Sequence, residues 1–236
     1  MEQKSSAGMA VKDEVIYQAL MNAMVEHQLP PGSKLPEEAL SDAFGVSRTG
    51  IRKVLQRLAT VQMVTLMPGR GAQVATPDVE EARNIFRTRS LMECANLPEV
   101  IAHVQPPHLA ALTRLIAREQ KAHHRRSGAE AITLSATFHI QLQAISGNQV
   151  LTELVTHLTQ RSSLVIAAYG SPWQQGCRCD DHQYLLDNLR ARDLAALTLA
   201  LQHHFEQIVT SLHFERGSET LPDFSRLFAD FRDMKS

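Results

Sequence analysis

The chain has 236 residues, a formal net charge of −1 and 44% hydrophobic residues. This length allows one large domain or two ordinary domains with buried cores. Because the net charge is close to zero, a surface that binds nucleic acid has to be local rather than spread over the whole chain. The sequence has no run of about 18 apolar residues, as a transmembrane helix requires, and its N-terminus lacks the apolar core of a signal peptide. We therefore expect a cytoplasmic protein that is not inserted in a membrane.

The first 76 residues predict three helices followed by a β-hairpin. Apolar residues recur with a helical period over residues 11–28, and this segment ends at a Pro-Pro-Gly turn. A second, short helix is expected over residues 36–44, and a third from about 48 to 60 with the Ser47 hydroxyl as its N-terminal cap. The sequences VTLM and AQVA then predict two strands joined by the tight turn PGRG. This order of elements is typical of a winged helix-turn-helix.

Positive charge is concentrated on the third helix and on the hairpin. From Phe44 to Gly71 there are five cations and no acids, whereas the whole stretch 1–76 holds eight cations and seven acids. Arg48 and Arg52 share a face at the start of the third helix, where a recognition helix enters the major groove of DNA. A solvated basic helix without a partner is the alternative, but the order of the elements favours a DNA-binding surface.

Beyond Thr76 the sequence is almost entirely helical. Helical periods and breaker residues predict six segments, which begin VEEARNIF, PPHLAALT, AEAITLSA, QVLTELVT, DDHQYLLD and DLAALTLA. Pro98 lies inside the first segment and is expected to kink or end it. We therefore expect a mainly α protein, in which a winged helix-turn-helix precedes an antiparallel bundle of six to seven helices that is large enough to hold a ligand.

Histidine is the informative residue type in this second part of the chain. His139 lies on the third helical segment, His182 at the start of the fifth and His204 on the sixth. If the last two segments pack antiparallel, His182 and His204 can face the same layer, and three imidazoles from three helices would then form a site for a divalent metal. Surface histidines or core histidines with hydrogen-bond partners are the alternative, and spacing alone does not decide between the two.

The segment LPPGSKLPEEALSDAFGVSRTGIRKVLQRLATVQMVTLMPGRGAQV resembles the N-terminal winged helix of the GntR family of bacterial transcription regulators. The matching features are PG followed by a leucine, the E-x-x-L pair, GVSR, the Ile-Arg step, LxRL and the glycine pair near the end. The resemblance implies five DNA-contacting residues, namely Arg48, Thr49, Arg52, Gly69 and Arg70. Two departures leave the operator sequence open. Gly50 stands where many members carry Thr or Pro, and Glu38 stands where some members place a base-reading Arg.

The sequences FHIQLQAISGN and DHQYLLDNLRARDLAALTLALQHHF look like the FCD effector domain of the FadR-type GntR proteins. The resemblance implies a metal site made of His139, His182 and His204, with zinc or nickel as the first candidates. The family places an acid one turn before the first histidine, and here that position is Ser135. A serine hydroxyl is a poor, neutral ligand, so water or a ligand carboxylate can fill its place. Three buried polar histidines without metal are the alternative.

Arg89, Ser135 and Arg161 are the candidates for binding an effector. Arg89 falls in FRTRSLME, which is similar to the Arg-x-x-x-Glu pattern of the family. The resemblance implies that its guanidinium clamps the carboxylate of a small organic acid, a task that suits its planar fork. A helix-surface ion pair between Arg89 and Glu93 is the alternative. The assignment of Arg161 rests on its position alone.

The expected order is a disordered N-terminus (1–10), a winged-helix domain (11–76), an all-helical effector-binding and dimerisation domain (77–220) and a C-terminal tail (221–236). The resemblance implies a ligand-responsive transcription regulator, not an enzyme, that binds a pseudo-palindromic operator as a homodimer. A metal-dependent enzyme using the histidines and an effector domain without metal are the alternatives. The sequence does not identify the effector or distinguish a repressor from an activator.

Overall fold

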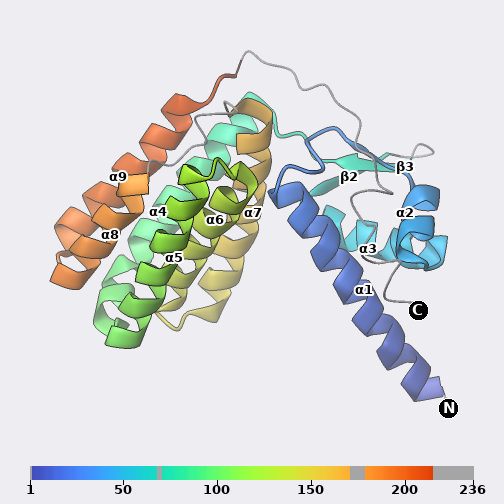
Figure 1. The fold of residues 1–236 in the computed structure, drawn as a ribbon, viewed down its shortest axis with the longest axis horizontal. Helices are drawn as coiled ribbons and strands as arrows, with labels where there is room; N and C mark the ends of the chain where they lie inside the picture. Colours follow the sequence, from blue (N-terminus) through green and yellow to red (C-terminus); the bar gives the residue numbers. More distant parts are fainter. Residues whose placement is uncertain (1, 68–70, 171–178, 215–236) are drawn as a thin grey trace. The chain divides into compact units, whose positions relative to one another are not determined.

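The computed structural model describes residues 2–67, 71–170 and 179–214, with only the backbone described for residues 2–11 and 179. The chain divides into two compact units between Thr76 and Pro77, the position at which the change from winged helix to bundle is expected. The first unit contains α1–α3 and a small sheet, and the second contains α4–α9 (Figure 1). The predicted fold class, mainly helical with a winged helix-turn-helix before a helical bundle, is confirmed.

The first unit is built from three helices and a three-stranded antiparallel sheet. The helices are α1 (Glu2–Val25), α2 (Glu37–Phe44) and α3 (Arg48–Thr60), and the strands are β1 (Lys34–Leu35), β2 (Val64–Met67) and β3 (Gly71–Val74). The sheet order is β1-β3-β2, so that β2 and β3 form the expected hairpin and β1 adds to its other edge. The sequence analysis missed β1, because a two-residue strand has no periodicity and exists only through its pairing with β3.

α1 begins at Glu2, which differs from the disordered N-terminus expected over residues 1–10. The backbone of residues 2–10 continues the helix that the apolar period of residues 11–28 predicts. This stretch contains no proline and includes several good helix formers, so nothing in it stops the helix from extending towards the N-terminus.

Local hydrogen bonds fix the start of α3. Gly45 ends α2 in the left-handed conformation (φ 61°), which a residue without a side chain adopts at little cost. The Ser47 hydroxyl then accepts a hydrogen bond from the amide of Gly50 at 3.2 Å, which confirms the predicted cap. Further along α3, Arg57 pairs with Glu14 of α1 at 2.7 Å and stacks on the Tyr17 ring. This cation therefore holds α1 against α3.

Replacing Gly50 with alanine is expected to stabilise the first unit by about 0.5–1 kcal/mol, because glycine in a helix loses more backbone entropy on folding. The added methyl group has room, since the nearest atom is the Ser47 hydroxyl oxygen at 3.6 Å. Urea denaturation of Gly50→Ala and the wild type measures the difference. A loss of stability would show that this position of α3 does not tolerate a Cβ atom.

The second unit is a bundle of six helices in the part of the chain that the structure describes. They are α4 (Val79–His103), α5 (Pro106–His124), α6 (Gly128–Ala144), α7 (Gln149–Tyr169), α8 (Cys179–Ala191) and α9 (Leu194–Ser211). α4 packs against α6, α7 and α9, while α5 packs against α6 and α8. The helices enclose one apolar core, with Phe86, Phe138 and Leu201 among its buried side chains. α4 continues through Pro98 to His103, so this proline does not end the helix.

Candidate functional sites

Three histidines from three helices meet inside the bundle. His139 of α6, His182 of α8 and His204 of α9 are all buried, and one nitrogen of each lies within 4.8 Å of the others. The Nε2 atom of His139 is 3.1 Å from Nε2 of His204 and 3.4 Å from Nε2 of His182. The structure thus brings together the three residues that the sequence analysis selected, which we call the histidine cluster.

A carboxylate stands behind each of these rings. Nδ1 of His139 is 2.8 Å from a Glu93 oxygen, Nδ1 of His182 is 2.6 Å from a Glu119 oxygen, and Nδ1 of His204 is 3.6 Å from an Asp181 oxygen. A carboxylate at Nδ1 favours the tautomer with its proton on Nδ1, and Nε2 is then the nitrogen that can coordinate a metal. The three rings each bring such a nitrogen to within 4.8 Å of the others, as metal ligation requires.

The sequence analysis missed Glu119 and treated Glu93 only as a partner of Arg89. A signal for both was present in the spacing of apolar residues. Glu119 continues the buried stripe of α5 after Leu112 and Ile116, and Glu93 lies on the buried stripe of α4. A charged residue where an apolar one is expected indicates a buried polar partner.

Burial keeps His139 and His204 of the cluster in their uncharged form. Burial lowers the pKa of His139 to about 3, even though Glu93 opposes this shift. Burial likewise lowers the pKa of His204 to about 4, even though the nearby Asp181 carboxylate opposes this shift. Both imidazoles are therefore neutral at pH 7, and neutral imidazole is the form that binds metal.

These shifts predict that the metal-free protein loses stability in mild acid. The unfolded chain binds protons at its histidines below about pH 6.5, whereas folded His139 and His204 take them up only near their lowered pKa values. Their stabilising contribution is therefore complete above about pH 6.5 and falls as the pH drops towards 4 and 3. Urea denaturation between pH 7.5 and 4.5 measures this, with His204→Gln expected to flatten the profile. A profile that is flat in the wild type would contradict the assignment.

The geometry of the cluster fits a tetrahedral metal. Nitrogen ligands at about 2.0–2.1 Å from zinc lie about 3.3–3.4 Å apart in a tetrahedral arrangement. The two Nε2 separations of 3.1 and 3.4 Å agree with this spacing. The donor set, three imidazole nitrogens with a carboxylate beside each ring, is also the set that zinc and nickel accept. The three histidines can therefore hold a metal ion.

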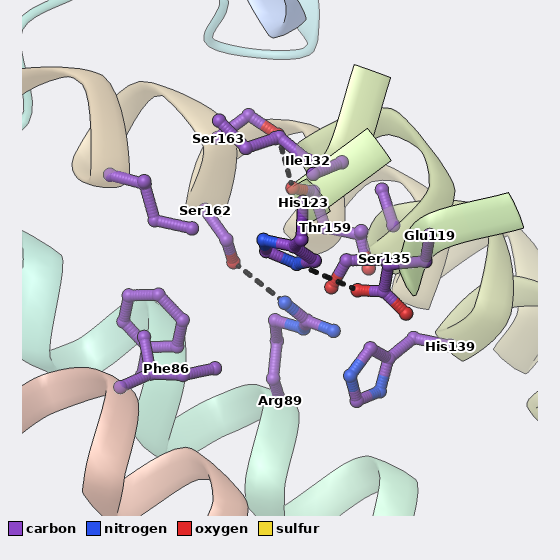
Figure 2. A pocket seen from close by; sticks show the side chains of 14 residues that line it. Phe86, Arg89, Glu119, His123, Ile132, Ser135, His139, Thr159, Ser162 and Ser163 are labelled. Atoms are coloured by element: carbon purple, nitrogen blue, oxygen red, sulfur yellow. Dashed lines mark hydrogen bonds and ion pairs between the residues drawn. The ribbon is translucent and has the colours of Figure 1, made fainter. Parts of the chain in front are cut away.

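A cavity opens beside the cluster, and we call it the Arg89 cavity (Figure 2). The cavity is narrow, because the space inside it that is open to the centre of a water-sized sphere is about 30 Å³. Its lining comprises Phe86, Arg89, Glu119, His123, Ala131, Ile132, Ser135, Ala136, His139, Thr159, Ser162, Ser163, Ile166 and Ile208. Ser135 and His139 both line it, so the cavity adjoins the open side of the cluster.

Arg89 is a buried residue of this cavity, with 4% of its surface exposed. Its Nε donates to Glu93 at 2.9 Å and its Nη1 donates to the Ser162 hydroxyl at 3.2 Å. The alternative of a helix-surface pair with Glu93 is therefore wrong, because Glu93 is fully buried too. Burial raises the pKa of Glu93, but the charge of Arg89 and the contact with His139 outweigh this and lower it to about 2. Glu93 thus connects Arg89 to the cluster.

Arg161 does not line the Arg89 cavity. It pairs instead with Glu81 of α4, which makes it a contact between α7 and α4. The helical period explains the difference, because Thr159, Ser162 and Ser163 occupy the cavity face of α7 while Arg161 lies to the side of that face.

The candidate DNA interface lies at the start of α3. The side chains of Arg48 and Arg52 are 60% and 59% exposed, and Thr49 is exposed between them. Arg52 donates two hydrogen bonds to the Glu37 carboxylate, at 2.9 and 2.6 Å, and Arg48 pairs with Glu38. A surface hollow next to Arg52 is lined by Glu37, Arg52, Gln56, Leu66, Met67 and Gly71. Gly69 and Arg70, predicted at the tip of the hairpin, lie outside the described residues.

Comparison with known proteins identifies both units. Residues 12–74 match the family of bacterial regulatory proteins called gntR, and residues 84–207 match the FCD domain. The chain is 24% identical to the HTH-type transcriptional repressor RspR of Escherichia coli (strain K12), over 85% of this chain and 88% of the repressor. It is 26% identical to the Nta operon transcriptional regulator of Aminobacter aminovorans, over 83% and 92% of the two chains.

The solved structure of E. coli McbR/YncC has the same fold, with a TM-score of 0.75 at 20% identity, covering 84% of this chain and 95% of that one. In the described part of the chain, none of the helices has both the length and the apolar character needed to cross a membrane. The FCD match alone spans more than half of the chain, and the gntR match covers the winged helix in front of it. The protein is therefore a transcription regulator of the GntR family with an FCD domain.

Proposed function

We propose that this regulator recognises its operator through the exposed start of α3. Arg48 and Arg52 offer guanidinium groups on one face, and Thr49 adds a hydroxyl between them. A guanidinium matches the O6 and N7 acceptors of guanine in the major groove. Gly69 and Arg70 of the wing would contact the DNA backbone or the minor groove beside it.

The acids of α2 support this assignment, because they hold the arginines in place before DNA arrives. Both carboxylate oxygens of Glu37 accept hydrogen bonds from Arg52, which restricts the rotation of the arginine side chain. Less conformational freedom is then lost when the guanidinium meets a base. When the protein binds DNA, Arg52 would donate hydrogen bonds to the edge of a guanine, either in place of those to Glu37 or in addition to them.

One observation carries the proposal. The guanidinium of Arg52 is exposed at the start of the recognition helix, and both oxygens of the Glu37 carboxylate hold it in position. We expect Arg52→Ala to bind DNA from the upstream region of its own gene about ten- to a hundred-fold more weakly, with less sequence preference. Electrophoretic mobility shifts across a salt series measure both effects. Arg118→Ala, at an exposed position of α5 in the other unit, is the matched control.

Two outcomes separate the proposal from a basic surface of no function. Recognition by α3 is supported if the wild type and Arg118→Ala bind a short palindromic site tightly and Arg52→Ala does not. Equal weak binding of all three proteins, governed by salt alone, would mean that the helix makes only nonspecific phosphate contacts.

The second part of the proposal concerns the FCD domain. The histidine cluster would hold zinc or nickel, and a small organic acid would enter the Arg89 cavity next to Ser135. Bound there, the metal supplies a positive centre for anionic or hydroxyl oxygens. Arg89 contacts both the cavity and Glu93, and Glu93 contacts His139, so the effector and the cluster share one chain of contacts.

A homodimer would present two α3 helices to the half-sites of a pseudo-palindrome. The effector can regulate such a dimer only if it binds one arrangement of the two helices more tightly than another. Operator binding measured with and without candidate acids tests this coupling.

A further inference from the structure

Four buried polar atoms on the wall of the Arg89 cavity have no hydrogen-bond partner among the residues that the structure describes. They are Nη2 of Arg89, Oε1 of Glu119, Nε2 of His123 and Oγ1 of Thr159. Buried polar groups in folded proteins are nearly always paired, because an unpaired one loses its hydrogen bonds to water without compensation. Four of them around one cavity indicate a binding site for a ligand with complementary polar groups.

Arg89 provides the part of the site that binds an anion. Two of its nitrogens already donate to Glu93 and Ser162, and the third, Nη2, remains available. Figure 2 shows the guanidinium between the Ser162 hydroxyl and His139, at the centre of the lining. A carboxylate oxygen of a ligand completes its hydrogen bonds.

Glu119 and His123 form a different kind of subsite. Oε2 of Glu119 is occupied by Nδ1 of His182, whereas Oε1 stands 3.9 Å from Nε2 of His123, too far for a direct hydrogen bond (Figure 2). A hydroxyl oxygen placed beside both atoms can donate its proton to Glu119 and accept one from His123. A carboxylate cannot donate, and an ammonium group cannot accept.

The carboxylate of Glu119 also disfavours a ligand that carries a second carboxylate. Oε2 of this buried carboxylate accepts a hydrogen bond from Nδ1 of His182 at 2.6 Å, while Oε1 lies on the wall of the cavity. A second carboxylate on the ligand would meet a buried like charge. Phe86, Ile132 and Ile166 also line the cavity, and their apolar side chains suit a short carbon skeleton.

We propose that the Arg89 cavity selects a small monocarboxylate that carries a hydroxyl group, with the carboxylate on Arg89 and the hydroxyl between Glu119 and His123. The inference rests on the proposed function, in which this cavity takes a small organic acid, and it names the class of that acid. Glu119 and His123 are the residues that determine the class, and Thr159 offers a further hydrogen bond to the same ligand.

Matched acids test this selection by isothermal titration of the full-length protein. One set consists of propanoate, lactate, alanine and malonate, and a second consists of butanoate, 3-hydroxybutanoate and succinate. In at least one set, the hydroxy acid is expected to bind about tenfold or more tightly than the unsubstituted acid, since a hydrogen bond to a charged group has that effect. The dicarboxylate is expected to bind most weakly. Each titration is done with chelator-treated and with zinc-loaded protein.

Glu119→Gln is the decisive variant, with Glu130→Gln, outside the cavity, as the control of identical chemistry. In Glu119→Gln the preference for the hydroxyl should fall below about threefold and the dicarboxylate should gain affinity. Circular dichroism checks its folding, and His123→Gln, at a partly exposed position, gives a second test of the same preference. The control should keep the wild-type order of affinities.

The outcomes separate this inference from the function on which it rests. Equal binding of hydroxy and unsubstituted acids, tighter binding of alanine or a dicarboxylate, or a hydroxyl preference that needs zinc and survives in Glu119→Gln would overturn the inference alone. No binding of any of these acids, with operator binding intact, would overturn the effector site as well.

Discussion

Replacing Glu93 with leucine is expected to lower the free energy of unfolding of the FCD domain by about 3–5 kcal/mol, because it leaves Arg89 buried without its counter-charge. Glu93 and Arg89 are both buried, and the same carboxylate holds Nδ1 of His139. The change therefore removes the partner of a buried cation and the orienting contact of a cluster histidine together. Urea denaturation of chelator-treated protein measures the loss.

Two controls show whether the buried charge is the cause. Glu130→Leu breaks the exposed pair with Arg125 and should cost less than about 1 kcal/mol. The double variant Arg89→Met with Glu93→Leu removes both charges and should recover a large part of the stability, as replacements of whole buried pairs by apolar residues often do. A single variant no less stable than Glu130→Leu would mean that water reaches Arg89 and that the cavity is wetter than its lining indicates.

Adding zinc to the chelator-treated protein is expected to stabilise it, by about 2.7 kcal/mol when free zinc is a hundred times its dissociation constant. The stabilisation follows because Nε2 of His139 already lies at ligand spacing from Nε2 of His182 and of His204, and because His139 and His204 are neutral at pH 7. Thermal unfolding with and without zinc measures the shift. Elemental analysis should then find one metal ion per chain.

His204→Ala should abolish this shift, whereas His203→Ala should keep it. His203 is the neighbouring residue on α9 but is exposed, so the two variants differ only in which face of the helix they change. No bound metal and no shift in the wild type would support the alternative in which the histidines are polar core residues. The FCD domain would then bind its ligand through Arg89 without a metal.

The sequence predicted well the features that depend on neighbours in the chain. The start of α3 is one example, because the Ser47 cap and Gly45 act within a few residues of each other. The hairpin of β2 and β3 is another, since two short apolar strands and a glycine turn determine its register locally. The histidine cluster was selected through the family pattern, and residue spacing alone left it open.

Contacts between distant segments were beyond the reach of the sequence. Glu119 of α5 meets His182 of α8 across 63 positions, and Arg89 of α4 meets Ser162 of α7 across 73. Arg161 shows the same limit, because the sequence placed it at the effector site, whereas its side chain pairs with Glu81 and does not line the cavity. Which helix faces which, and by what rotation, is decided by the packing of the whole bundle.

The sequence by itself thus determined the helices, the hairpin and their order, because periodicity, caps and turns act over a few residues. Its resemblance to a family pointed to the three histidines. Only the tertiary structure decided that each histidine has a carboxylate behind it, that Arg89 is buried beside them, and that four unpaired polar atoms surround one cavity. The physical reason is that burial and pairing of charge depend on side chains that meet from the six helices α4–α9, and no single stretch of sequence contains that information.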